Sequence, residues 1–212
     1  MLSIQIPTVD RRSHVFEPLY YELKRQAAPF GDDIEILYLS DDGTMPLARK
    51  RSLLYEMSTK PYSVQWDDDD WIHPLGIFNI MKGVVKHPDC ICYRMISEFQ
   101  GRAEYRETGY LRVTDFRRRY KVLMKKTESP HLPYDECHPP SNKCVIRTDL
   151  ARKAANSINP NQRYGEDGDF AKEVVKSLKT EYYIDMGLYW YLNTSGDAWG
   201  PQRYGLPKNY IF

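Results

Sequence analysis

Residues 62–71 read YSVQWDDDDW, and this stretch decides how the rest of the sequence is interpreted. Its first five residues, with two aromatic side chains and a valine, predict a short buried strand over 62–66. Four consecutive aspartates follow immediately. Carboxylates this close together repel one another, and the carboxyl end of a strand is where open α/β sheets place their ligands. The stretch therefore indicates a site for something cationic.

The spacing of the aspartates suggests a metal. In an extended chain Asp67 and Asp69 face the same side, so together they predict a site for one hard cation, Mn²⁺ or Mg²⁺. Such an ion keeps positions open for phosphate oxygens, which indicates a nucleotide diphosphate as its other ligand. The same run also permits a register with Asp68 and Asp70. An acidic surface turn, or a cap for a helix beginning near Pro74, is the alternative without a ligand.

The first hundred residues alternate short strands with helical patterns, which is typical of a layered α/β sheet. Besides the strand at 62–66, we expect strands at 2–6 and 34–39 and helices at 16–26, 47–57 and 74–86.

The second half is less regular. Proline-rich residues 127–140 predict a long, mobile loop. We expect strands at 90–96, 109–113, 143–147, 182–184 and 188–192, and helices at 149–156 and 167–178.

Length and charge limit the class of protein. The 212 residues leave room for one domain, and no apolar stretch approaches the roughly 20 residues of a membrane helix. The 30 basic and 29 acidic side chains nearly cancel, which argues against a purely electrostatic nucleic-acid binder. No secretory signal precedes the first predicted strand, so we expect a cytoplasmic location.

A second acidic group, GEDGD at residues 165–169, opens a predicted helix. Carboxylates are favoured in the first turn of a helix, so these side chains can be explained by the helix dipole alone. Alternatively, a carboxylate aimed into a cleft near the metal could take a proton from an attacking hydroxyl. Glu166 and Asp167 are adjacent and cannot both point at one place.

Three further motifs accompany the two acidic groups: Pro7-Thr8 after the first strand, Asp41-Asp42-Gly43-Thr44, and Ala48-Arg49. Together with the aspartates before Trp71 and with Glu166-Asp167, they resemble a family 2 glycosyltransferase of the GT-A fold. The likeness is strongest over residues 2–82 and 143–192.

The resemblance implies an α/β fold: a single GT-A domain over residues 1–212, with a Rossmann-like, mostly parallel mixed sheet flanked by helices. Residues 1–100 would form the half that binds the nucleotide sugar. Residues 101–192 would form the acceptor-binding and catalytic half, and residues 193–212 a C-terminal tail.

The resemblance also implies residue roles. The nucleotide sugar, usually with uracil as its base, would be bound by Pro7, Thr8, Asp10, Asp41, Asp42, Arg49, Asp67 and Asp68. Asp69 and Asp67 would hold the metal. Glu166 and Asp167 would form the catalytic pair, with Asp167 as the base.

Two departures from the family pattern matter. Only Thr44 to Leu47 separate the acidic loop from Ala48-Arg49, and Lys50 replaces the usual asparagine, which bears on the assignment of Arg49. The Q-x-x-R-W segment of processive members is absent. We therefore expect transfer of one sugar.

Acceptor-binding residues are suggested by two features. Residues 117–126 carry six basic side chains and no acidic one, which is typical of a solvated face but also fits a patch for anionic polymers. Arg117, Arg118 and Arg119 are the candidates there. The indole of Trp71 could form the bottom of the sugar or acceptor site, or it could be part of the core.

The resemblance thus implies a metal-dependent, inverting transferase that moves a single sugar from a UDP-sugar to an acceptor hydroxyl. The acceptor would be a glycan, a lipid-linked intermediate, a protein or a modified nucleic-acid base. A metal-dependent nucleotidyltransferase or nuclease, or a non-catalytic sugar-binding module on the same fold, is the alternative.

Overall fold

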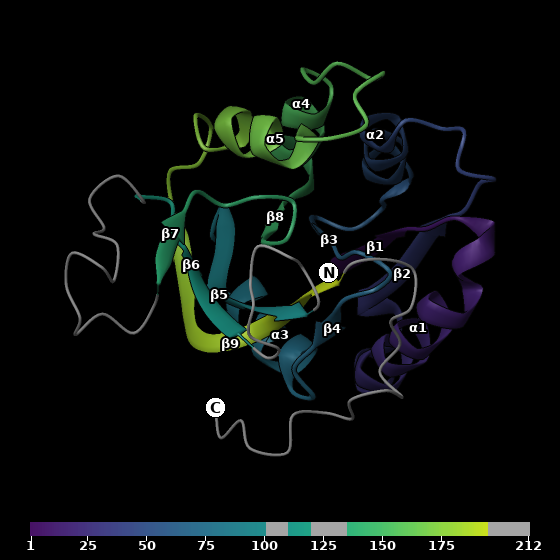
Figure 1. Ribbon diagram of the computed structural model, residues 1–212. Helices are drawn as coiled ribbons and strands as arrows, with labels where there is room; N and C mark the ends of the chain where they lie inside the picture. Colours follow the sequence, from purple (N-terminus) through teal and green to yellow (C-terminus); the bar gives the residue numbers. More distant parts are fainter. Residues whose placement is uncertain (101–109, 120–134, 195–212) are drawn as a thin grey trace.

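The computed structural model describes residues 1–100, 110–119 and 135–194, which form one sheet between two layers of helices (Figure 1). The helices are α1 (Ser13–Ala27), α2 (Leu47–Met57), α3 (Gly76–Val84), α4 (Thr148–Ala155) and α5 (Glu166–Val174), with 3-10 helices η1 (Asp10–Arg12) and η2 (Ala28–Asp33). The strands are β1 (Leu2–Pro7), β2 (Ile34–Leu39), β3 (Tyr62–Gln65), β4 (Trp71–Ile72), β5 (Cys90–Gln100), β6 (Tyr110–Phe116), β7 (Glu136–His138), β8 (Val145–Arg147) and β9 (Glu181–Thr194). The predicted α/β class, with a mixed sheet flanked by helices, is confirmed.

Strands β2, β1 and β3 lie side by side and run parallel, with Leu2 of β1 opposite Ile34 and Tyr62. The chain passes from β1 to β2 on one side and returns to β3 on the other, so the strand order reverses between β1 and β3. Such a reversal opens a crevice at the carboxyl ends of the strands. The strand that ends before the four aspartates therefore borders the position where this fold binds ligands.

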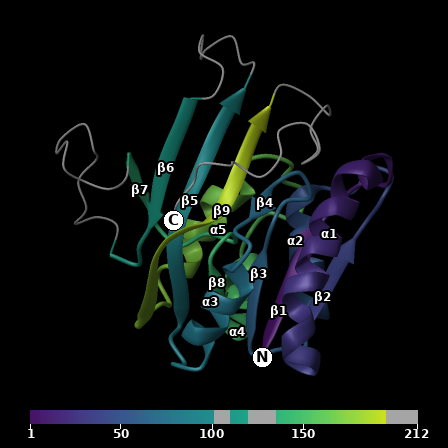
Figure 2. The same ribbon diagram turned by 90° about the horizontal axis from the view of Figure 1, so that it is seen from below.

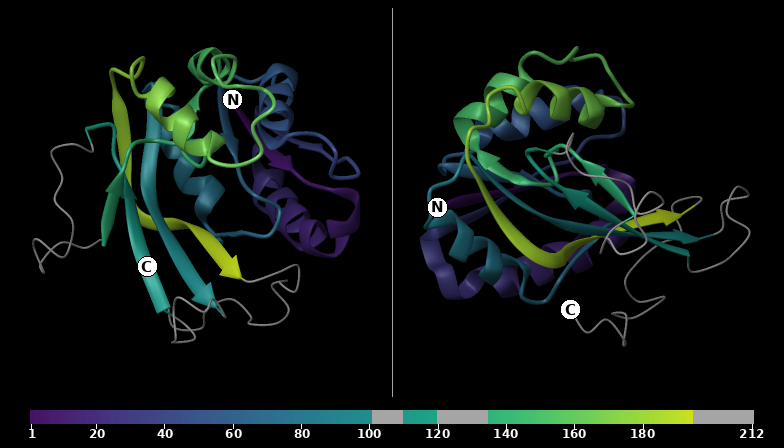
Figure 3. Two further views of the ribbon diagram at one scale, coloured as in Figure 1. Left: turned by 45° about the horizontal axis from the view of Figure 1, so that its top comes forward. Right: turned by 90° about the vertical axis from the view of Figure 1, so that its left-hand side faces the viewer.

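The other half of the sheet mixes parallel and antiparallel pairs. β8 pairs antiparallel with β3 and β5, β6 pairs antiparallel with β5, and β7 pairs parallel with β6. β9 is one long strand parallel to β5, visible as the curved yellow ribbon in Figure 3. Its register with β5 shifts near Arg94, where β9 carries extra residues. The prediction of two separate strands at 182–184 and 188–192 is therefore wrong, because an irregularity within one strand breaks the sequence pattern.

The predicted loop over 127–140 is wrong at its C-terminal end, because Glu136–His138 forms β7 against Thr114–Phe116. Residues 127–134 lie outside the described part of the chain. So do residues 120–126 of the basic run and residues 195–212 of the predicted tail. The short strand β4, which pairs Trp71 with Trp190 of β9, has no clear sequence signal.

The two faces of the parallel strands differ in polarity. Leu2, Ile4 and Ile6 of β1 pack with side chains of α1 and α3 in the larger apolar core. Figure 2 shows these two helices in front of the sheet. The alternate residue Gln5 is completely buried and bonds to Gln65 of β3 (2.6 Å) on the opposite face. Beneath α2, then, the sheet presents polar groups that need partners.

A second apolar core lies beneath α4 and α5, on the same side of the sheet as α2 (Figure 1). It includes Tyr55 of α2 stacked on Phe170 of α5, with ring centroids 5.5 Å apart. This packing holds α5 against α2. No helix in the described ranges is both long and apolar enough to cross a membrane.

Gly83 allows α3 to approach the sheet closely. A Cβ at this position would lie 2.8 Å from Cδ1 of Tyr182 and 2.9 Å from Cδ1 of Ile91. We expect Gly83→Ala to lower the free energy of unfolding by about 1–2 kcal/mol, since overpacking outweighs the gain in helix propensity. Gly168→Ala in α5, where a Cβ meets nothing within 4 Å, should be neutral or stabilising. Urea denaturation of both variants checks this; equal stabilities would contradict it.

Asp89 fastens the start of β5 to the turn before β9. Its Oδ2 accepts from the backbone amides of Lys179 (2.8 Å) and Thr180 (2.9 Å), and its Oδ1 accepts from Arg147 (3.3 Å). Burial acts to raise the pKa of Asp89, but these hydrogen bonds outweigh it and hold the pKa below its usual range. The stabilisation is therefore complete above the unfolded-state pKa and is lost as the pH falls through the folded-state pKa.

We expect Asp89→Asn to cost about 1–3 kcal/mol at pH 7, with the difference from the wild type shrinking below about pH 4. Unfolding curves at pH 7 and pH 3 measure both. Asp149→Asn removes an exposed partner of the same Arg147 and should change stability by less than about 0.5 kcal/mol at either pH. A constant Asp89→Asn difference across this range would rule out the proposed linkage.

Candidate functional site

The loops after β1 and β2 are joined at the carboxyl edge of the sheet. The backbone amide of Thr8 donates to the carbonyl of Leu39 (3.0 Å), and that of Asp10 donates to the carbonyl of Asp41 (2.9 Å). The carboxylate of Asp42 accepts from the amide and hydroxyl of Thr44, closing a tight turn. The structure thus brings together the residues predicted to surround a nucleobase: Pro7, Thr8, Asp10, Asp41 and Asp42.

Lys50 of α2 ties these two loops to the helix. Its buried ammonium donates to the carbonyl of Thr8 and to Oδ1 of Asp41. Burial acts to raise the pKa of Asp41, but the bond from Lys50 and the amide of Met45 (2.7 Å to Oδ2) outweigh it and lower the pKa. Arg49, the residue named by the sequence, is exposed on the same helix. The neighbouring Lys50 and Arg51 face the site instead.

The four aspartates form a turn and not an extended segment, because the amide of Asp70 donates to the carbonyl of Asp67 (3.3 Å). The expectation that alternate aspartates share a strand face is therefore wrong in its premise. The exposure of the side chains nevertheless distinguishes the two pairs of alternate aspartates. Asp68 and Asp70 are buried at 2% exposure, whereas the side chains of Asp67 and Asp69 are 22% and 31% exposed.

Asp68 and Asp69 are bound from the β1 side. Asp68 accepts from the hydroxyl of Thr8 (2.6 Å) and pairs with Arg12 of η1 (3.0 Å), which also contacts Asp69 (2.5 Å). Burial raises the pKa of Asp68 to about 6, against the opposing pull of Arg12. The Thr8–Asp68 bond spans the crevice between β1 and β3.

Asp70 fixes the other end of the turn to β9. Its Oδ2 accepts from the hydroxyl of Tyr189, and its Oδ1 accepts from the amide of Leu192 (2.9 Å). Burial, together with the negative charges of Asp69 and Asp67, raises the pKa of Asp70 well above its usual range. The Tyr189 hydroxyl also accepts from the amide of Asp67 (3.1 Å).

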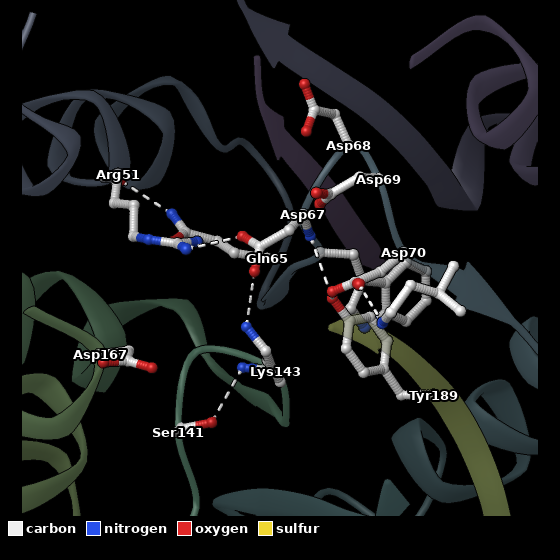
Figure 4. A network of polar contacts seen from close by, with 12 residues as sticks. Arg51, Gln65, Asp67, Asp68, Asp69, Asp70, Ser141, Lys143, Asp167 and Tyr189 are labelled. Atoms are coloured by element: carbon white, nitrogen blue, oxygen red, sulfur yellow. Dashed lines mark hydrogen bonds and ion pairs between the residues drawn. The ribbon is translucent and has the colours of Figure 1, made fainter. Parts of the chain in front are cut away.

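Asp67 lies between two buried cations (Figure 4). Its Oδ1 accepts from Arg51 of α2 (2.6 Å), and its Oδ2 accepts from Lys143 (2.7 Å), which precedes β8. Burial acts to raise the pKa of Asp67, but the two cations outweigh it and hold the pKa well below its usual range. The ammonium of Lys143 also lies 5.6 Å from the ring centroids of Tyr189 and Tyr191.

The two acidic residues that open α5 point in different directions. Gly165 precedes them in the left-handed conformation (φ 76°), which turns the chain into the helix. Glu166 is buried and accepts from Nε of Arg51 (3.1 Å). Asp167 is exposed, and its Oδ1 accepts from the amide of Gly168 (2.7 Å). Glu166 is thus tied inward, and Asp167 is left accessible.

A cleft of about 680 Å³ separates Asp167 from the aspartate turn. Asp67, Lys143 and Tyr191 line it together with Asp167, and Figure 4 shows Asp167 across from Lys143. Arg163, also in the lining, donates to the carbonyls of Gly43 (3.3 Å) and Thr44 (2.6 Å). The loop before α5 is thereby tied to the loop after β2.

The candidate acceptor residues lie elsewhere. Trp71 packs beside the apolar cluster of Ile96, Trp190 and Leu192, which favours the core alternative for this side chain. The guanidinium of Arg117 lies 3.0 Å from the ring centroid of Tyr183 and pairs with Asp115 (3.0 Å). The amide of Arg118 donates to Glu181 (2.7 Å), and Arg119 is exposed. None of these four belongs to the described lining of the cleft.

The oxygen ligands offered by the turn suit Mg²⁺ or Mn²⁺. Asp69 is the most exposed of the four aspartates and uses Oδ2 for Arg12, whereas Asp67 has both oxygens bound to cations. Within the described ranges, no three or more His, Cys, Asp or Glu side chains gather to form a metal cage. Asp69 could therefore offer one carboxylate to such an ion. Asp67 would have to release Arg51 or Lys143 before it could bind directly.

Sequence reasoning missed the cations: Arg12, Lys50, Arg51 and Lys143. Arginine and lysine usually lie at the surface, so their residue type does not mark these positions. Their partners lie between 9 residues (Lys50–Asp41) and 115 residues (Arg51–Glu166) away in the sequence. The only available signal was that buried carboxylates require nearby cations.

No protein-family model matches the chain, and neither does any curated protein. Solved structures of S. aureus TarS do match. One has a TM-score of 0.62 and 14% identity and covers 90% of this chain and 36% of that chain. TarS 1-349 in complex with UDP-GlcNAc has a TM-score of 0.63 and 13% identity, and the match covers 92% of this chain and 59% of that chain. TarS 1-349 in complex with UDP has a TM-score of 0.63 and 14% identity, and the match covers 90% of this chain and 60% of that chain.

This chain therefore spans between 36% and 60% of the length of these TarS chains. At 13–14% identity the likeness concerns the fold, and the predicted GT-A-like fold is confirmed. Membership of family 2 stays a prediction.

Lys50 and Arg49 form a natural test pair. Lys50→Met leaves the buried Asp41 carboxylate and the Thr8 carbonyl without their cation, and we expect it to cost about 3–5 kcal/mol of stability. Arg49→Met, at the exposed neighbouring position, should change stability by less than about 0.5 kcal/mol. Thermal and urea unfolding measure both. A stable Lys50→Met protein would show that this bond does not hold the loops.

Proposed function

We propose that the protein is a glycosyltransferase that takes its sugar from a nucleotide-diphosphate donor, UDP-sugar being the best candidate. The observation that carries this proposal is the placement of Asp167 across the 680 Å³ cleft from Asp67 and Lys143, at the carboxyl edge of a GT-A-like sheet. The fold neighbours with bound UDP and UDP-GlcNAc support the choice of donor. Membership of family 2 is part of this proposal.

The donor would lie across the crevice between β1 and β3. The joined loops that carry Thr8, Asp10 and Asp41 would contact the nucleobase, and Asp67 and Asp68 would lie beside the ribose and diphosphate. Hydrogen bonds and ion pairs within the protein hold both sides of this crevice in place. Pre-ordering of this kind lowers the entropic cost of binding.

A divalent cation at this site would be held by Asp69 and by phosphate oxygens. It would supply positive charge that offsets the charge developing on the departing diphosphate. Lys143 lines the cleft, and Arg12 pairs with Asp69 of the turn, so both bring positive charge to the aspartates. Metal dependence is therefore proposed with Asp69 as the protein ligand.

The transfer itself needs one base. Asp167 would accept the proton of the acceptor hydroxyl as that oxygen forms a bond to the anomeric carbon. The bond from this carbon to the diphosphate oxygen breaks at the same time, and the electron pair leaves with the nucleotide. Attack from the side opposite the leaving group inverts the anomeric centre, and no covalent enzyme intermediate is required.

The acceptor is proposed as a hydroxyl compound that receives one sugar: a glycan, a lipid-linked intermediate, a protein or a modified nucleic-acid base. Asp167 lies on the exposed side of the cleft, which leaves room for a large acceptor. A metal-dependent nuclease or nucleotidyltransferase is the rival that the same aspartates allow. The nuclease would break a phosphodiester bond with water, whereas the nucleotidyltransferase would break the phosphoanhydride bond of a nucleoside triphosphate and form a new phosphoester bond.

The test measures UDP released from a panel of UDP-sugars with Mn²⁺. Asp167→Asn should reduce turnover by about 10²–10⁴-fold and leave UDP binding within threefold, because only the proton transfer is lost. Asp69→Ala should instead weaken Mn²⁺-dependent UDP binding. Asp169→Asn, on the same helix but paired with Lys172 at the surface, is the matched control and should behave as wild type.

The rivals predict different outcomes. Cleaved strands in a parallel incubation with nucleic acid and Mn²⁺, without UDP release, would support the nuclease. Binding of UDP-sugars without any turnover would support the non-catalytic module. Undiminished turnover of Asp167→Asn would remove this residue as the base.

A further inference from the structure

Among the described residues, Arg51 is the one side chain that contacts both the aspartate turn after β3 and the acidic start of α5. From α2, its Nη2 donates to Asp67 of the turn (2.6 Å), and its Nε donates to Glu166 at the start of α5 (3.1 Å). Asp67 and Glu166 are 99 residues apart in sequence, since Arg51 lies 16 residues from the first and 115 from the second. A single guanidinium thus connects the turn to the helix that carries Asp167.

This bridge, formed by Asp67, Arg51 and Glu166, is held in place by two buried glutamines. Gln65 of β3 accepts from Nη1 of Arg51 (3.4 Å), and its own amide donates to the backbone carbonyl of Arg51 (2.8 Å) and to Gln5 of β1 (2.6 Å). Both glutamines are completely buried, and Arg51 is 7% exposed. The guanidinium therefore cannot swing away without leaving several buried polar groups unpaired.

An arginine is required for this connection. Its planar guanidinium offers donors in fixed directions, so one side chain can hold two carboxylates at a set separation. A lysine ammonium has the same charge but is a single nitrogen on a flexible stem. The matched substitution Arg51→Lys therefore preserves charge while loosening the geometry.

We propose that Arg51 is a positioning residue, which holds the helix start bearing Asp167 at a fixed distance from the aspartate turn that receives the donor. This inference rests on the proposed glycosyltransferase function. Glu166, adjacent to Asp167 but turned inward, then acts only through Arg51. Disturbing the bridge moves Asp167 relative to the anomeric carbon, and small misplacements of reacting groups reduce rates strongly.

The bridge predicts a particular split in kinetics. Glu166→Gln keeps the shape of the side chain but removes its charge, so the α5 end of the bridge loosens while Asp67 keeps Lys143. We expect the kcat of UDP release to fall by about 10- to 100-fold, with KM for the UDP-sugar within threefold. Arg51→Lys should lower kcat by a similar factor. A purely structural role would lower the melting temperature and leave kcat per folded molecule unchanged.

A double-mutant cycle tests the coupling directly. Glu166 and Asp67 share Arg51, so the effects of Glu166→Gln and Asp67→Asn on kcat should not multiply. We expect the double variant to retain at least about fivefold more activity than the product of the two single losses. Glu173→Gln is the matched control on the same helix, because Glu173 pairs with Lys176 at the surface (2.6 Å). Glu173→Gln should leave kcat unchanged, and combined with Asp67→Asn it should give the same kcat as Asp67→Asn alone.

The outcomes separate this inference from the proposed function. Suppose that the wild-type protein releases UDP and that the losses of kcat from Glu166→Gln and Asp67→Asn multiply fully. The positioning role of Arg51 would then be overturned, and the proposed function would stand. The bridge would also be overturned if Glu166→Gln and Arg51→Lys both kept wild-type kcat. If the wild-type protein released UDP from no UDP-sugar, the function would fail first, and the bridge as a catalytic device would fail with it.

Discussion

The compensation of charge around Asp67 is the interaction on which the rest of the site depends. Two carboxylates about 5 Å apart repel each other by roughly 3 kcal/mol at an effective dielectric constant of 20, and four adjacent ones multiply this cost. The fold offsets it with Arg12, Arg51 and Lys143. These cations come from η1, α2 and the segment before β8. The turn is therefore stable only after distant parts of the chain have assembled.

This requirement explains why the two faces of the sheet differ. Leu2, Ile4 and Ile6 give β1 an apolar face beneath α1 and α3, which supplies hydrophobic stabilisation without any polar partner. The face beneath α2 carries Gln5 and Gln65, whose amides must be satisfied and which hold Arg51. At the parallel strands, one face of the sheet thus builds the larger apolar core, and the other carries the polar groups beside the candidate site. The hydrogen bonds among Gln5, Gln65 and Arg51 restrict the motion of these side chains, and the proposed transfer between two bound substrates needs such fixed positions.

The likeness to TarS at 13–14% identity shows how little of a sequence such a fold requires. The shared fold needs the order of strands and helices and the reversal between β1 and β3, which many side chains can produce. The chemistry that we propose depends on a few groups near that reversal. In this chain they are the carboxylates after β3, the acidic start of α5, and the cations that join them.

The sequence alone determined the elements whose patterns are local: the strands at 2–6, 34–39 and 62–66, the helices between them, and two acidic groups at an element end. Periodicity and the position of Gly, Pro and Asp carry this information over short distances. Only the tertiary structure decided that Lys50 and Arg51, and not Arg49, face the site, that Glu166 turns inward, and that β9 is one strand. Those outcomes depend on ion pairs and sheet pairing between residues far apart in the chain, and the free energy of such contacts leaves no pattern in a single sequence.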